Sequence, residues 1–146
     1  MHLFKVFLCL LALTLFGHAQ TDASKIAPDD FRALTVRGFL SDIKTGDLKN
    51  AFRRISNNPP AKRKSFDQFA RYVQGDSALG EITNFHLLSA HTVRGAGIVK
   101  VQTTNRSGKT GNIQFELRQP ERDDTGEGEG WEIVGISSVT KFPKSE

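Results

Sequence analysis

Two hydrophobic periods follow one another along most of the chain. Between about residue 28 and Gly75, apolar residues recur every three or four positions, which is typical of helices with one buried face. After Gly80 the period becomes two, which is typical of strands with one covered and one solvated face. The pattern therefore predicts an α+β domain in which three N-terminal helices pack on a curved four-stranded antiparallel sheet.

The first helix is predicted over residues 28–45. Pro28 favours the first turn of a helix, and Gly46 favours its end. Between them, an apolar stripe recurs near the helical period, at Phe31, Leu34, Val36, Phe39, Leu40 and Ile43.

Capping residues predict two further helices. Asp47 is a candidate N-cap for a second helix, which ends before the Asn57–Pro60 segment. Ser65 and Gln68 have the spacing of a capping box and predict a third helix, which closes at Gly75.

Four alternating segments predict the strands, which cover residues 82–93, 98–105, 111–119 and 131–139. The two middle strands place an apolar set on the inner side of the sheet, namely Val99, Val101, Thr103, Ile113, Phe115 and Leu117. Their outer side is polar and carries Lys100, Gln102, Gln114, Glu116 and Arg118. This outer side disfavours a large apolar interface but permits a polar homodimer.

The first 19 residues have the three parts of a secretory signal peptide. Lys5 precedes an apolar run over residues 6–16, and the small residues of Gly17–Ala19 follow. The run is too short for a transmembrane anchor, so we do not expect an integral membrane protein. We expect cleavage after Ala19 and export to the bacterial periplasm or the medium. The expected divisions are a signal peptide (1–19), a flexible lead (20–27), one domain (28–140) and a tail (141–146).

Composition excludes several kinds of chemistry. Cleavage leaves 127 of the 146 residues, and Cys9 is lost with the signal peptide. Without a thiol, the mature chain has no disulfide, cysteine nucleophile or zinc–thiolate site. The formal net charge of +4 becomes +3 when Lys5 is removed, which is far from the composition of nucleic-acid-binding proteins. We expect no cofactor, no metal and no nucleic acid partner.

Three segments resemble the nuclear transport factor 2-like (cystatin-like cone) superfamily. Residues 39–52 resemble its opening, in which Gly-Asp joins a helix to a short helix, and residues 65–69 resemble its third helix. Residues 130–136 resemble its terminal strand, which a tryptophan opens. Within the superfamily, the chain looks like small exported bacterial domains of unknown function. The resemblance implies the cone fold over residues 30–140 but no particular activity, because the superfamily includes enzymes, binding modules and structural proteins.

A cone-pocket isomerase or dehydratase is one functional hypothesis. It would need a base and a hydrogen-bond donor in a dry pocket, and the candidates are Tyr72 with His86 or Asp42. His86 and His91 are five residues apart, so a strand without a bulge places them on opposite faces. Because the inner residues of the middle strands are apolar, the sequence favours a core there over a catalytic lining. We therefore lean against an enzyme.

The other hypothesis is a non-catalytic domain that binds a small ligand or a protein partner. A basic segment without an acidic residue supports it, and its cations are Lys49, Arg53, Arg54, Lys62, Arg63 and Lys64. This segment could bind an anionic envelope surface, or it could be a solvated loop. The acidic residues between 121 and 129 lack the spacing of a calcium loop and favour a solvated hairpin tip.

Overall fold

A computed structural model describes residues 26–55, 65–119 and 130–139. The elements are the helices α1 (Phe31–Thr45), α2 (Leu48–Arg53) and α3 (Phe66–Gly75), followed by the strands β1 (Ile82–Val93), β2 (Ala96–Asn105), β3 (Thr110–Arg118) and β4 (Glu132–Val139). The strands form one open antiparallel sheet in the order β1-β2-β3-β4. The predicted α+β class, with three helices and four antiparallel strands, is confirmed.

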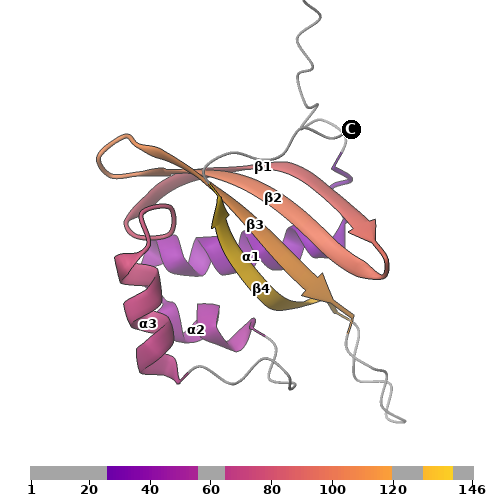
Figure 1. Ribbon diagram of the computed structural model, residues 1–146, viewed down its shortest axis with the longest axis horizontal. Coiled ribbons are helices and arrows are strands. Elements are labelled where there is room, and N and C mark those ends of the chain that lie inside the picture. The colour runs from indigo at the N-terminus through magenta and orange to yellow at the C-terminus, as the bar shows by residue number, and fades with distance from the viewer. Residues whose placement is uncertain (1–25, 56–64, 120–129, 140–146) are drawn as a thin grey trace, which may run out of the picture.

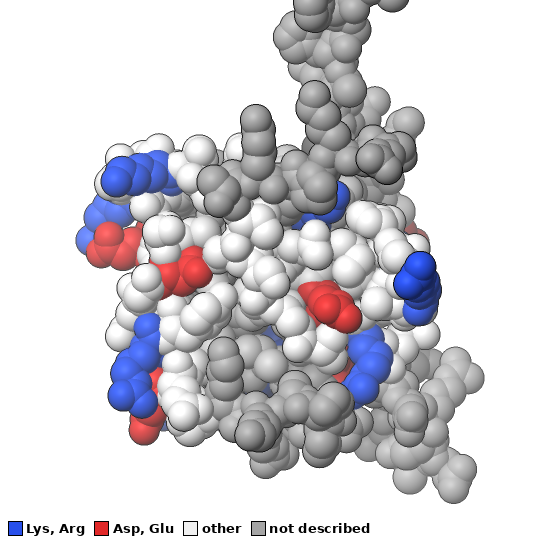
Figure 2. Space-filling model, viewed as in Figure 1, with Lys and Arg blue, Asp and Glu red and all other residues white. Residues whose placement is uncertain are grey.

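The helices lie against one face of the sheet (Figure 1). In that view α1 crosses behind the strands, and α2 and α3 lie beside its C-terminal half. The opposite face of the sheet has no described helix over it. In Figure 2 the parts of this face that are not drawn in grey are mostly uncharged, with single charged side chains scattered over it.

The helix α1 begins three residues later than the sequence predicted. Asp30 is its N-cap, and the Asp30 side chain accepts hydrogen bonds from the backbone N–H groups of Arg32 and Ala33. These N–H groups of the first turn have no partner within the helix, and the Asp30 carboxylate satisfies them. The helix therefore begins directly after Asp30 and not at Pro28. The predicted stop is confirmed, because Gly46 has a φ of +80° and caps the C-terminus.

The capping predictions for α2 and α3 are also confirmed. The Asp47 side chain accepts from the N–H of Asn50, and Ser65 and Gln68 form a reciprocal capping box. The hairpin between β1 and β2 is tighter than predicted, however. Arg94 and Gly95 both have positive φ angles, as in a two-residue type I′ turn, so β2 begins at Ala96 and not at residue 98.

Three phenylalanines from different elements fill the space between α1 and the sheet. Phe39 of α1 is fully buried and contacts the rings of Phe69 and Phe115 edge-on, at centroid distances of 6.1 and 5.6 Å. The inner residues of β2 and β3 complete this core, and all six that the sequence placed there are buried, namely Val99, Val101, Thr103, Ile113, Phe115 and Leu117.

A group of four residues, which we call the Arg32 cluster, fastens the start of α1 to the sheet. The Arg32 guanidinium donates to both carboxylate oxygens of Asp30, at 2.9 and 2.6 Å, and to Thr92 Oγ1 in β1. It also lies 5.8 Å from the ring centroid of Trp131, just before β4. The cluster therefore ties α1 to both edge strands at one end of the domain.

Candidate functional site

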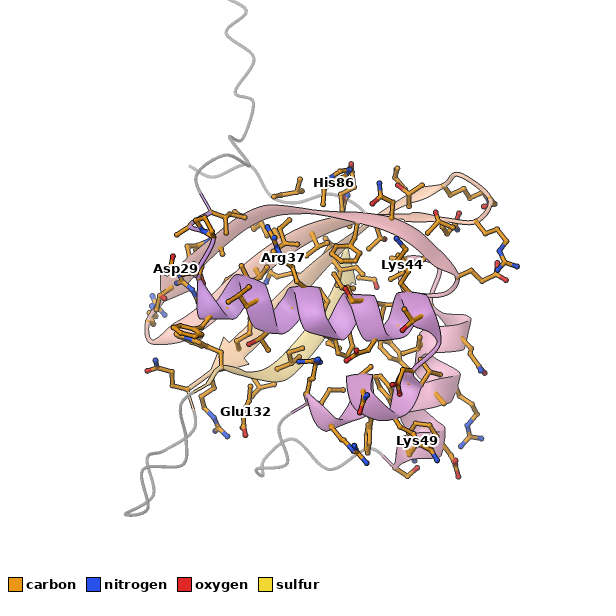
Figure 3. The ribbon with its side chains drawn as sticks, turned by 180° about the vertical axis from the view of Figure 1, so that it is seen from behind. Asp29, Arg37, Lys44, Lys49, His86 and Glu132 are labelled. Atoms are coloured by element: carbon orange, nitrogen blue, oxygen red, sulfur yellow. The ribbon has the colours of Figure 1, made fainter. Side chains whose placement is uncertain are left out.

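The helix α2 presents two of the predicted binding residues to solvent. Lys49 and Arg53 are both exposed and lie four residues apart, so their side chains share one face of the helix. Figure 3 shows Lys49 beside α2, on the side of α1 that is away from β1. Arg53 donates to Asn50 Oδ1, one helical turn before it, at 3.3 Å. We call this pair the α2 basic face.

Arg54 has a different role from Lys49 and Arg53. Its Nε donates to Asp42 Oδ2 at 2.6 Å. Its guanidinium is only 2.7 Å from the position that a Cβ on Gly38 would occupy. A predicted binding residue and a predicted catalytic residue therefore form an ion pair that joins α1 to α2. Gly38 permits this close approach because it has no side chain. The remaining predicted binding residues, Lys62, Arg63 and Lys64, lie outside the described residues.

Tyr72 lies next to Ser138 and Asp76 rather than next to His86 or Asp42. Ser138 Oγ donates to Asp76 Oδ2 at 2.7 Å, and Tyr72 shares a hydrogen bond with Ser138. The other oxygen of Asp76 accepts from the N–H groups of Ala78 and Leu79, at 2.8 and 2.9 Å. Both oxygens of the Asp76 carboxylate are therefore engaged. Because Ser138 lies in β4, the contacts among Tyr72, Asp76 and Ser138 link the end of α3 to that strand.

The outer face of the sheet carries His86 and His91 together, which differs from the arrangement in a regular strand. His86 pairs with Gln102 and His91 pairs with Ile98, and the register shifts between Leu87 and Ser89. This bulge adds one residue and therefore reverses the alternation beyond it. The two pairing positions are four residues apart on β2, so the histidines are about 13 Å apart along the strand and cannot bind one metal ion together.

The three predicted catalytic residues are thus distributed over three separate places. Tyr72 is at the end of α3, Asp42 is paired at the α1–α2 contact, and His86 is exposed on the outer face (Figure 3). Within the described ranges, every buried side-chain nitrogen or oxygen has a hydrogen-bond partner. In the same residues, no group of three or more His, Cys, Asp or Glu side chains could hold a metal ion.

The phenol of Tyr72 gives a direct test of this local structure. Burial, and then the charge of Asp76, raise the pKa of Tyr72 above 10.0, whereas the hydrogen bond with Ser138 lowers it. Tyr72 is the single tyrosine of the chain, so the ultraviolet absorbance of tyrosinate reports it alone. We expect D76N to lower this pKa and S138A to raise it. A titration that is unchanged in both variants would contradict the described contacts.

The same shift predicts how stability changes in alkali. The folded state holds the Tyr72 proton more tightly than the unfolded state, where the pKa is near 10.0. The resulting stabilisation is present below pH 10 and is lost as the pH rises through the raised pKa. Urea unfolding of the wild type should therefore show a steeper alkaline loss of stability than unfolding of Tyr72→Phe.

The sequence reasoning missed a second pair of exposed cations, Arg37 and Lys44. They are seven residues apart on α1 and therefore lie in one row along the helix. In Figure 3 both labels lie on the side of α1 that is next to β1, whereas Lys49 lies on the other side. Neither has a hydrogen bond or ion pair within the described residues, so both charges are available. The helical period was a signal that could have found them.

The fold and these surfaces define an α+β domain with a filled interior and cationic helix surfaces. No protein-family model matches the chain, and no curated protein is significantly similar to it. The superfamily resemblance therefore stays a prediction. None of the described helices has the length and apolar character required to cross a membrane.

Proposed function

We propose that the mature chain is an exported, non-catalytic domain that binds an anionic partner through the α2 basic face. The observation that supports a surface site is the filled interior, where Phe39, Phe69 and Phe115 occupy the space between α1 and the sheet. A small ligand could enter that space only by displacing packed aromatic rings.

The charges of α2 support an anionic partner. Lys49 and Arg53 are exposed, whereas Arg54 is held by Asp42 and contributes little net charge to the surface. In the sequence, Lys62, Arg63 and Lys64 follow within ten residues of Arg54 and add three cations to the same basic segment. Each basic residue near an anionic lipid surface contributes about 1 kcal/mol to binding.

Vesicle sedimentation tests this proposal. The mature protein should sediment with phosphatidylglycerol vesicles but not with phosphatidylcholine vesicles, and added salt should release it. The variant K49E/R53E should bind about thirtyfold more weakly, because the contributions of two cations are lost. The variant R37E/K44E has the same change in net charge and serves as the matched control, with less than a twofold change expected. Equal losses in both variants, or no vesicle binding by the wild type, would contradict the proposal.

A further inference from the structure

The two edges of the sheet are closed to different extents. At the β4 edge, the chain that leaves α2 forms a parallel bridge between Ile55 and Ile133, and the N–H of Ile133 donates to the carbonyl of Arg54. At the β1 edge, no described backbone group outside β2 bonds to residues 83–93. Within the described residues, one edge of the sheet is thus capped at its start, and the other has no strand partner along residues 83–93.

The open edge lacks most of the features that usually prevent strand addition. Edge strands are commonly protected by charges, proline or short length, and β1 contains neither a Lys, Arg, Asp or Glu residue nor a proline. Its two register irregularities, at Thr83 and at Leu88, are one protective feature. The side chain of Asn84 is another, because its Oδ1 accepts from the N–H of Phe85 at 2.9 Å.

This local hydrogen bond also shows which backbone groups face away from the sheet. The N–H of Phe85 donates to Asn84 and so points away from β2, and alternation gives the N–H of Leu87 the same direction. Phe85 and Ala90 are half-buried at this edge and leave apolar surface beside it. The edge therefore offers backbone donors and apolar contact together.

Arg37 and Lys44 determine what kind of strand would fit. Both lie on the side of α1 next to β1 (Figure 3), and the hydrogen bond from Arg32 to Thr92 fixes α1 along that strand. A second copy of the chain paired edge to edge would bring these cations against their own copies, which is unfavourable. An acidic segment would instead place carboxylates beside both of them.

We propose that the free edge of β1 is a docking site for an extended acidic segment of another protein. The segment adds a fifth strand to the sheet through main-chain hydrogen bonds, and carboxylates at alternating positions lie near Arg37 and Lys44. The other charged or titratable groups described around this edge are the following. Glu81 precedes the strand and Arg94 follows it, Arg32 is bonded to Thr92 and paired with Asp30, and His86 and His91 lie on the outer face. The proposal concerns a different surface from the α2 basic face and does not depend on it.

The probe is a fluorescent eight-residue peptide of alternating glutamate and valine. Its binding to the mature protein is measured by fluorescence anisotropy. We expect it to bind, and we expect an alternating lysine–valine peptide to bind at least about tenfold more weakly. The variant R37E/K44E should reverse this preference, whereas K49E/R53E should change it less than twofold. A peptide methylated on alternate backbone nitrogens should not bind, because it cannot form the ladder. Equal effects of the two double variants would overturn the proposal.

Amide hydrogen exchange locates the contact. Bound peptide should slow exchange of the Leu87 N–H about tenfold and leave amides of α2 unchanged. Asn84→Ala should tighten binding, because it frees the N–H of Phe85. Protection of Leu87 that rises with protein concentration in the absence of peptide would instead indicate a second copy at this edge. That result, or peptide binding without protection in β1, would overturn the proposal and leave the test of the α2 basic face unaffected.

Discussion

Replacing Phe39 by alanine should destabilise the domain by about 4 kcal/mol, the largest effect that we expect from a single substitution. Phe39 is fully buried, and its ring contacts Phe69 and Phe115 from two other elements. The substitution removes both aromatic contacts and leaves a cavity that the surrounding rigid elements cannot close. Urea unfolding followed by circular dichroism measures the change in the free energy of unfolding.

Phe31→Ala is the matched control for this substitution. It makes the same chemical change in the same helix, but Phe31 is 68% exposed, so we expect a change within about 0.5 kcal/mol. The cavity in Phe39→Ala should also bind benzene, which should raise the stability of that variant and not of the wild type. A loss below about 1.5 kcal/mol in Phe39→Ala would indicate a loosely filled interior. The hypothesis of an internal ligand site would then regain support.

Replacing Arg32 by alanine should cost about 2 kcal/mol, which is the second largest expected effect. The substitution removes a two-point ion pair with Asp30, a hydrogen bond to Thr92 and the cation–π contact with Trp131. It also leaves the Asp30 carboxylate, whose side chain is only 10% exposed, without its charged partner. Trp131 is the single tryptophan of the chain, so its fluorescence should change as well.

Arg37→Ala is the control here, because Arg37 is exposed on the same helix and has no described partner; we expect a change within about 0.5 kcal/mol. Arg32→Lys should recover less than half of the loss, since an ammonium group cannot make the two-point contact. Equal stabilities of Arg32→Ala and Arg37→Ala would show that the Arg32 cluster contributes nothing.

The contribution of the Arg32 cluster to the free energy of unfolding should depend on pH. The hydrogen bonds from Arg32, which are the largest cause, hold the pKa of Asp30 below 3.8. The folded state therefore favours the ionised carboxylate. The contribution is fully present above pH 3.8 and is lost as the pH falls through the lowered pKa. The difference in stability between the wild type and Arg32→Ala should shrink over that range, and a difference that grows on acidification would contradict this account.

The sequence by itself determined the features that depend on neighbouring residues. The two hydrophobic periods distinguish helices from strands, and the capping residues Asp47, Ser65 and Gly46 form their bonds within one turn of the backbone. The inner residues of β2 and β3 follow from simple alternation, because these two strands pair without a bulge. Such local signals are readable because a residue and its sequence neighbours are always close in space.

Only the tertiary structure decided which distant residues meet. A bulge at Leu88 reversed the face of His91, and the alternation of side chains alone does not reveal a single inserted residue. The contacts of Arg54 with Asp42, of Tyr72 with Ser138, and of Arg32 with Thr92 join residues between 12 and 66 positions apart. They depend on strand register and on how the helices cross the sheet. The position of β1 beside Arg37 and Lys44 is likewise a property of sheet order, which places β1 at an edge of the sheet.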